Sequence, residues 1–209
     1  MESALSDGAC DPGLRLIETL GWTGATFPRL GLHLARLARS AARLGWPCDP
    51  VAVTAALRQA APADPARMRL TLDATGAIAV QSSPMPPAKP LWTLTLAPIR
   101  LQSSDPWLTL KSTRRVGYDA ARAALPPGVD EVIFQNERGE VCDGTITSLF
   151  FDRGHGLRTP PLHCGLLPGV LREDIAAPEE ILLESDLPHV RLWIGNSLRG
   201  LIPCSFMSA

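Results

Sequence analysis

The first half of the chain alternates between strand-like and helix-like hydrophobic patterns. Residues 14–22 (LRLIETLGW) form an apolar run that predicts a strand. In residues 28–47 the apolar side chains recur every three or four positions, which predicts an amphipathic helix that ends at Gly45. Asp49 followed by Pro50 predicts a second helix, because Asp caps the first amides and proline suits the first helical position.

Strand-like patterns then dominate up to the C-terminus. Residues 67–81 alternate and turn at Thr75-Gly76, which predicts a hairpin, and residues 91–101 predict another strand before a linker at residues 103–106. The elements expected after the linker are a helix in 113–125, strand, turn and strand in 130–152, a short strand in 156–162, a helix in 164–175, and strands with short turns in 179–187, 189–197 and 198–203.

These patterns predict an α+β fold of two domains. Residues 1–104 would form a small α+β domain, and residues 105–209 a larger, strand-rich domain. Hydrophobic residues make up 45% of the chain and charged residues 20%, as in ordinary globular proteins. The net charge of −1 provides no basic field for nucleic acid or anionic membranes, and the apolar runs are too short to span a bilayer. The acidic start has no signal-peptide pattern, so we expect a cytoplasmic protein.

The cysteines and histidines give no metal-site pattern. The five cysteines are odd in number and widely spaced, and no C-x-x-C pair occurs. We therefore expect free thiols, no disulfide framework and no metal. The four histidines share no spacing, and we interpret them as structural or exposed.

Lysine is rare in this chain, which draws attention to Lys111. Of the 20 basic residues, only Lys89 and Lys111 are lysine, and the other basic residues are arginine. Arginine stays protonated in proteins, whereas lysine can become a nucleophile toward carbonyls when burial or a nearby cation favours its neutral form. Lys111 follows a strand-like WLTL run and precedes a predicted helix, with Arg114 and Arg115 close by. The alternative interpretation is a solvated side chain at a helix start.

Asp143 is a second candidate for chemistry. It lies within an apolar segment (VCDGTITSLFF), where a buried acid needs a cationic partner. A carboxylate that faces a protonated pyridine nitrogen is what a pyridoxal phosphate (PLP) site requires. Asp-Gly is also a common turn dipeptide, but residues 136–140 already supply a turn upstream.

Three further features suit a phosphate. A Gly/Pro loop (CGLLPG) opens a predicted helix, so the amides of Val170 and Leu171 would be available to a phosphate. Arg29, in the first turn of the first helix, would add a guanidinium, and Ser197 in GNSLRG would add a hydroxyl. Each feature alone has a structural explanation: a common helix start, a surface arginine and a capping serine.

Taken in order, these segments resemble the class IV (fold-type IV) PLP enzymes. The resemblance rests on FPRLGLHLARLARSA, LKSTRR, DEVIFQNERGEVCDGTITSLFF, LRTPPLHCGLLPGVLRE and NSLRGLIP, and it extends from about Glu18 to Pro203. The family includes branched-chain and D-amino-acid aminotransferases and 4-amino-4-deoxychorismate lyase. The motifs look closest to the lyase domain that some bacteria fuse behind aminodeoxychorismate synthase.

The resemblance implies a D-amino-acid aminotransferase-like fold and a role for each candidate. Lys111 matches the lysine that binds PLP covalently, and Asp143 stands at the position of the acid that faces the pyridine nitrogen. The residues that match the phosphate site are Arg29, Val170, Leu171 and Ser197. Candidates for the substrate carboxylates are Thr19, Arg114 and Arg115. The resemblance also implies a homodimer with the active site in the cleft between the two domains.

The sequence differs from the family pattern at three points. Asp143 replaces the usual Glu and shortens the side chain by one methylene, Ser148 stands where Asn is common, and the strand pair before the ETL segment is short or absent. These differences keep open a PLP-binding homologue with impaired catalysis.

The resemblance leaves two reactions open for an amine substrate that carries a carboxylate. In the lyase reaction, 4-amino-4-deoxychorismate yields 4-aminobenzoate and pyruvate, a step of folate biosynthesis. In the aminotransferase reaction, a branched-chain or D-amino acid yields a keto acid. Both need Lys111 to move a proton, and the motifs do not specify the shape of the substrate pocket.

Overall fold

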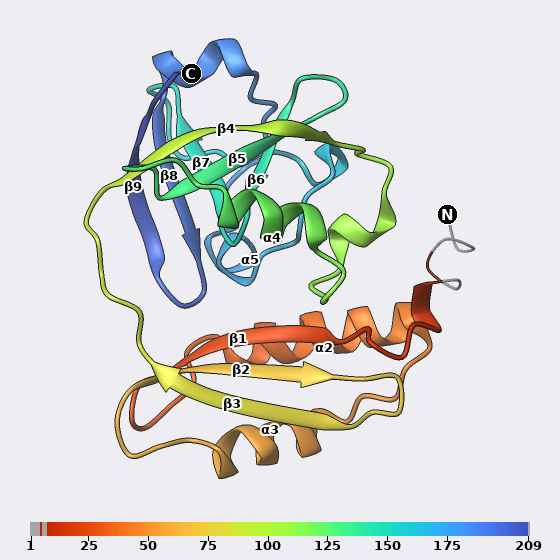
Figure 1. Cartoon of the computed structure of the whole chain (residues 1–209). Helices are drawn as coiled ribbons and strands as arrows, with labels where there is room; N and C mark the ends of the chain where they lie inside the picture. The colour runs from red at the N-terminus through yellow and green to blue at the C-terminus, as the bar shows by residue number, and fades with distance from the viewer. Residues whose placement is uncertain (1–4, 6–7, 209) are drawn as a thin grey trace. The chain divides into compact units, whose positions relative to one another are not determined.

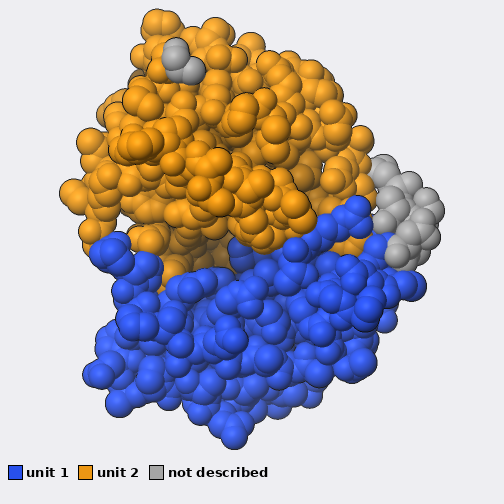
Figure 2. All heavy atoms as spheres, viewed as in Figure 1, with its two compact units in different colours: residues 1–87, 110–114 blue, residues 88–109, 115–209 orange. Residues whose placement is uncertain are grey.

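The computed structural model describes residue 5 and residues 8–208. The chain forms two compact units, coloured separately in Figure 2. Unit 1 comprises residues 1–87 and 110–114, and unit 2 comprises residues 88–109 and 115–209. The five residues around Lys111 thus belong to unit 1, although the chain on both sides of them belongs to unit 2.

Unit 1 is a three-stranded antiparallel sheet with two helices (Figure 1). The strand order is β1-β2-β3, and the elements are β1 (Leu16–Trp22), α2 (Leu30–Leu44), α3 (Pro50–Gln59), β2 (Ala66–Leu72) and β3 (Ile78–Pro84). Helix α2 ends at Gly45 in the left-handed conformation, which glycine adopts without strain. Helix α3 begins as expected, because the Asp49 side chain accepts a hydrogen bond from the Val51 amide at 2.9 Å.

The two faces of this sheet differ in polarity. Every second residue of β2 is fully buried, and its register with β1 places Leu16, Glu18 and Leu20 on the same buried face. Helix α2 covers that face, since His33 and Arg36 reach Glu18 there. The intervening residues of β1 and β2 therefore lie on the opposite face of the sheet.

Unit 2 is built on a closed six-stranded barrel, β4-β5-β6-β7-β8-β9. The strands are β4 (Trp92–Leu101), β5 (Glu131–Asn136), β6 (Val141–Gly144), β7 (Ser148–Asp152), β8 (Arg191–Asn196) and β9 (Gly200–Phe206). The other elements are η1 (Pro106–Thr109), α4 (Val116–Ala123), η2 (Leu162–Cys164), α5 (Val170–Ile175) and η3 (Glu184–His189). Side chains from all six strands form one apolar core, which includes Leu94, Ile133, Val141, Leu149, Ile194 and Ile202.

The structure differs from the sequence expectation at four points. Strand β4, expected in the first domain, lies in unit 2, because it pairs with β5 and β9 to close the barrel. The WLTL run before Lys111 contains the 3₁₀ turn η1 instead of a strand, and residues 179–187 contain η3 and isolated bridges. The short strand expected in residues 156–162 is reduced to two isolated bridges. Short apolar runs do not distinguish strands from single turns of helix.

In the described part of the chain, no helix combines the length and the apolar character needed to cross a membrane.

Candidate active site

Lys111 is held on the open edge of β1. The Ile17 amide donates to the Lys111 carbonyl oxygen at 2.8 Å, and the Thr113 amide donates to the Arg15 carbonyl oxygen at 2.9 Å. Leu16 and Ser112 form the antiparallel bridge between these two bonds. Strand β1 lies at the edge of its sheet, so this edge is free to take the extra segment. Lys111 therefore stands opposite Ile17, on the sheet face that α2 does not cover.

That face carries Thr19 and two arginines that sequence analysis missed. Thr19 pairs with Arg69 and Gly21 pairs with Arg67, which places both arginines on the face of Lys111. Among the described residues, neither guanidinium has a hydrogen-bond acceptor or an acidic partner. Two guanidiniums on the sheet face of Lys111 suit a substrate with more than one carboxylate. The alternating pattern of ARMRLTL is enough to place Arg67 and Arg69 on one face of a strand. It does not show that Lys111 lies on the same face of the sheet.

Arg29 precedes the first turn of α2 instead of lying within it. It is the N-cap residue and adopts a left-handed backbone, φ 58 and ψ 23, which is uncommon for a residue other than glycine. Its carbonyl oxygen accepts from the amides of Leu32 at 3.0 Å and His33 at 3.2 Å. Such a conformation persists where the surrounding structure enforces it, often at functional sites.

A buried acid ties the start of α2 to β1. Glu18 is 3% exposed and accepts from His33 Nδ1 at 2.6 Å and from Arg36 Nε and Nη2 at 2.8 and 2.6 Å. Burial alone would raise the pKa of Glu18, but the charge of Arg36 and the hydrogen bonds from both partners lower it to about 2. This cluster fixes the helix turn that follows Arg29 and the strand position before Thr19.

The two arginines after Lys111 have different surroundings. Arg114 is exposed in unit 1, and its amide donates to the Ser112 hydroxyl at 3.2 Å. Arg115 lies in unit 2, where its guanidinium donates to Asp119 at 2.6 Å and to the Thr145 carbonyl oxygen at 3.0 Å. These bonds favour a structural role for Arg115 over contact with substrate.

In unit 2, Asp143 lies on β6 and is 5% exposed. Its Oδ2 accepts from the Leu167 amide at 3.2 Å, and its Oδ1 accepts from the Tyr118 hydroxyl at 3.5 Å. Leu167 belongs to the loop that leads to α5. The carboxylate is thus fixed by the same loop that ends at the candidate phosphate site.

The start of α5 packs directly on strands β7 and β8. Ser148 and Gly195 pair across these strands. A Cβ atom at Gly169 would collide with the Ser148 hydroxyl, and one at Gly195 would lie 2.6 Å from Leu171 Cδ2. The amide nitrogens of Val170 and Leu171 have no acceptor within the described part of the chain, as is usual for the first turn of a helix. This close-packed turn suits a phosphate, and Ser148 fills the space that Gly169 leaves.

Ser197 lies in the turn between β8 and β9. Asn196 fixes this turn, because its Oδ1 accepts from the amides of Leu198 and Arg199 at 3.1 and 3.0 Å. The Asn196 side-chain amide donates to the Ile146 carbonyl oxygen at 3.1 Å. The turn of Ser197 is therefore bonded to the segment that follows Asp143.

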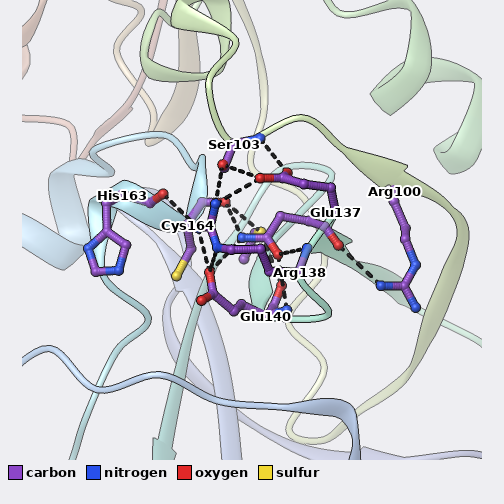
Figure 3. A network of polar contacts seen from close by, with 9 residues as sticks. Arg100, Ser103, Glu137, Arg138, Glu140, His163 and Cys164 are labelled. Carbon is purple, nitrogen blue, oxygen red and sulfur yellow. Dashed lines mark hydrogen bonds and ion pairs between the residues drawn. The ribbon is translucent and has the colours of Figure 1, made fainter.

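A polar network supports the loop before α5 (Figure 3). Arg138 donates to Glu140 Oε2 at 2.6 Å, to Ser103 Oγ at 2.6 Å and to the His163 carbonyl oxygen at 3.2 Å. The hydrogen bond from Arg138 lowers the pKa of Glu140 to about 2. Potential ligand atoms of Glu140, His163 and Cys164 lie within 4.8 Å of one another, but Arg138 already neutralises the only carboxylate, which disfavours a metal there.

Comparison with known proteins identifies the relatives of this chain. The profile of a family described as amino-transferase class IV matches residues 15–206. A candidate aminodeoxychorismate lyase from Schizosaccharomyces pombe is 31% identical over 174 residues, which cover 77% of this chain and 72% of that protein. The crystal structure of a candidate amino-acid aminotransferase from Mesorhizobium loti is 43% identical, with a TM-score of 0.89 over 93% of this chain and all of that one.

A more distant structure has the same fold. A hypothetical aminotransferase from Mycobacterium tuberculosis, solved with α-ketoglutarate and PMP bound, has a TM-score of 0.81 at 22% identity, over 95% of this chain and 83% of that one. The family resemblance and the α+β fold expected from the sequence are thereby confirmed.

Proposed function

Because the chain belongs to the class IV aminotransferase family, we propose that it is a PLP-dependent lyase that converts 4-amino-4-deoxychorismate to 4-aminobenzoate and pyruvate. The observation that carries the choice of reaction is the pair Arg67 and Arg69 on the sheet face of Lys111. The substrate has two carboxylates, one on the ring and one on the enolpyruvyl group, and two guanidiniums match them. A branched-chain or D-amino acid with one carboxylate leaves one of these cations unpaired.

Each unit carries residues that suit PLP. In unit 2, the amides of Val170 and Leu171 and the Ser197 hydroxyl would bind the phosphate, and the family resemblance gives Arg29 of unit 1 the same ligand. The buried carboxylate of Asp143 would pair with the protonated pyridine nitrogen. Close packing at Gly169 and Gly195 supports this assignment, because it fixes the first turn of α5, which carries the amides of Val170 and Leu171. The PMP bound to the Mycobacterium tuberculosis protein supports the same cofactor class.

Within this proposal, Lys111 moves the proton. When bound, PLP supplies an electron sink for the carbon that carries the substrate amine. Lys111 Nζ would hold the cofactor in the resting protein and, once released, would take the proton from the amine-bearing ring carbon of the substrate. Loss of the enolpyruvyl group makes the ring aromatic, and return of one proton to that group gives pyruvate. Arg67 and Arg69 would hold the two carboxylates while the C–O bond breaks.

Transamination is the second candidate, because the Mesorhizobium loti relative is a candidate amino-acid aminotransferase. The two reactions share the proton removal by Lys111 and differ in where the proton is returned. The homodimer and the cytoplasmic location belong to the same proposal and follow from the family resemblance and the sequence.

A coupled assay tests the proposal. The purified chain is incubated with PLP, chorismate, glutamine and an aminodeoxychorismate synthase, and 4-aminobenzoate is followed by its fluorescence. We expect product that depends on the chain, no product with Lys111→Ala, and full activity with Lys89→Ala, which changes the other lysine. Bleaching of the yellow protein by an amino acid without any 4-aminobenzoate would support transamination instead. A colourless protein that binds no PLP would contradict both enzyme functions.

A further inference from the structure

One side of α4 contacts the segment that carries Asp143. Arg115, Tyr118 and Arg122 stand three and four positions apart, so they lie along the same side of the helix. Arg115 donates to the Thr145 carbonyl oxygen at 3.0 Å, and Arg122 donates to the Thr145 hydroxyl at 3.2 Å. Tyr118 lies between these two arginines and reaches Asp143 itself.

Tyr118 is the only tyrosine of the chain. Its ring packs edge-on against Phe134 with the centroids 4.8 Å apart, and the Arg115 guanidinium lies 5.9 Å from its centroid. These contacts aim the hydroxyl at Asp143 Oδ1, 3.5 Å away. Burial and the negative charge of Asp143 raise the pKa of Tyr118 far above its usual range, so the hydroxyl stays protonated and donates a hydrogen bond to the carboxylate.

The rest of the segment is held from the barrel side by Glu131, which is fully buried on β5. Glu131 accepts from the hydroxyls of Thr145 at 2.5 Å and Thr147 at 3.1 Å, and from Arg122 at 3.3 Å. A Cβ atom at Gly144 would lie 2.9 Å from Glu131 Cγ, so no larger residue fits between them. The backbone after Asp143 is therefore fixed. The orientation of the Asp143 carboxylate then depends on the groups that donate hydrogen bonds to it.

We propose that Tyr118 is a positioning residue for Asp143: its hydroxyl and the Leu167 amide hold one carboxylate oxygen each and set the orientation in which Asp143 meets the ring nitrogen of PLP. This role rests on the proposed function, because it requires Asp143 to pair with the cofactor. It also explains how the shorter Asp serves in place of Glu. Two donors on opposite oxygens restrict the rotation of a short side chain to one orientation.

The contact is tested first without cofactor. Protein labelled with ζ-¹³C tyrosine gives one NMR signal, which comes from Tyr118 alone. We expect Asp143→Asn to move this signal, because the hydroxyl loses an ionised acceptor. Asp64→Asn, an equivalent change at an exposed residue of unit 1, leaves the signal in place. A signal that is the same in wild type and Asp143→Asn would overturn the proposal.

The role toward the cofactor is tested with Tyr118→Phe, which keeps the ring against Phe134. We expect the dissociation constant for PLP to rise about three- to tenfold, which is less than the loss of a direct hydrogen bond to a charged group, because Tyr118 would act on the cofactor only through Asp143. The absorption maximum of the bound cofactor should also shift, which a purely structural role would not cause. Val116→Ala, an exposed position on the same helix, serves as control. Thermal unfolding shows whether each variant is folded.

The outcomes separate this role from the proposed function. A wild-type protein that binds PLP, together with a folded Tyr118→Phe that has the same affinity and spectrum, overturns the role of Tyr118 alone. A wild-type protein that binds no PLP overturns the proposed function and this role with it.

Discussion

The carbonyl oxygen of Lys111 accepts a hydrogen bond from the amide of Ile17 at 2.8 Å. This bond makes Lys111 part of the sheet of unit 1, although residues 88–109 before it and residues 115–209 after it belong to unit 2. A lysine on a sheet edge has a fixed backbone, so only its side chain moves during a reaction. The rigid placement suits the role proposed for Lys111, which is to bind PLP and to transfer a proton.

The two arginines on the face of Lys111 should control substrate affinity. We expect Arg67→Gln and Arg69→Gln each to raise the KM for 4-amino-4-deoxychorismate about 10- to 100-fold, because each removes a charged hydrogen bond. The affinity for PLP should stay unchanged. Arg58→Gln, an exposed arginine on α3, is the matched control. Steady-state kinetics measure the effect, and an unchanged KM in both variants would remove the argument for two carboxylates.

Glu18 should make stability depend on pH in the acid range. Its folded pKa of about 2 lies below its ordinary value of 4.5, so its contribution is complete above pH 4.5 and is lost as the pH falls toward 2. The full contribution is on the order of 3 kcal/mol. We expect the free energy of unfolding, measured with urea at several pH values, to fall more steeply in wild type than in Glu18→Gln. Parallel curves for the two proteins would contradict this assignment.

Gly195 on β8, which packs against the first turn of α5, should respond oppositely to Gly31 in helix α2. A Cβ atom at Gly195 would meet the Gly200 carbonyl oxygen and Leu171, so Gly195→Ala should destabilise the fold by about 1–3 kcal/mol and weaken PLP binding. A Cβ atom at Gly31 in α2 would meet nothing within 4 Å, so Gly31→Ala should stabilise the protein by about 0.5–1 kcal/mol. Chemical denaturation measures both. Equal effects would show that the turn has room to adjust.

Local signals in the sequence were sufficient to predict the main helices, strands and turns of unit 1. The strand at residues 14–22, the helix that ends at Gly45, the cap at Asp49 and the turn at Thr75-Gly76 all lie close to where they were expected. Each depends on side chains within a few residues, which periodicity and turn chemistry reveal. The membership of β4 in unit 2 depends on its pairing with β5 and β9, about 40 and 110 residues away, and no local pattern encodes such a pairing.

The residues of the candidate site likewise divide into those that the sequence predicts and those that only tertiary contacts reveal. Lys111, Asp143, Arg29, Val170, Leu171 and Ser197 could be chosen from residue type and context, and the resemblance gave each of them a role in one site. Arg67 and Arg69 were not chosen, because their relation to Lys111 arises from the pairing of residues 110–114 with β1. Tyr118 was missed because its role depends on a contact between α4 and β6. Roles that depend on tertiary contacts require the structure.

The central claim is that Lys111 holds PLP covalently, and reduction of the loaded protein tests it most directly. The protein is incubated with PLP, treated with borohydride and digested, and the modified peptide is identified by mass spectrometry. We predict one phosphopyridoxyl group on Lys111, none on Lys89, and loss of the modification in Lys111→Arg, which keeps the charge. An adduct on Lys89 alone, or no stoichiometric adduct on Lys111, would contradict the account.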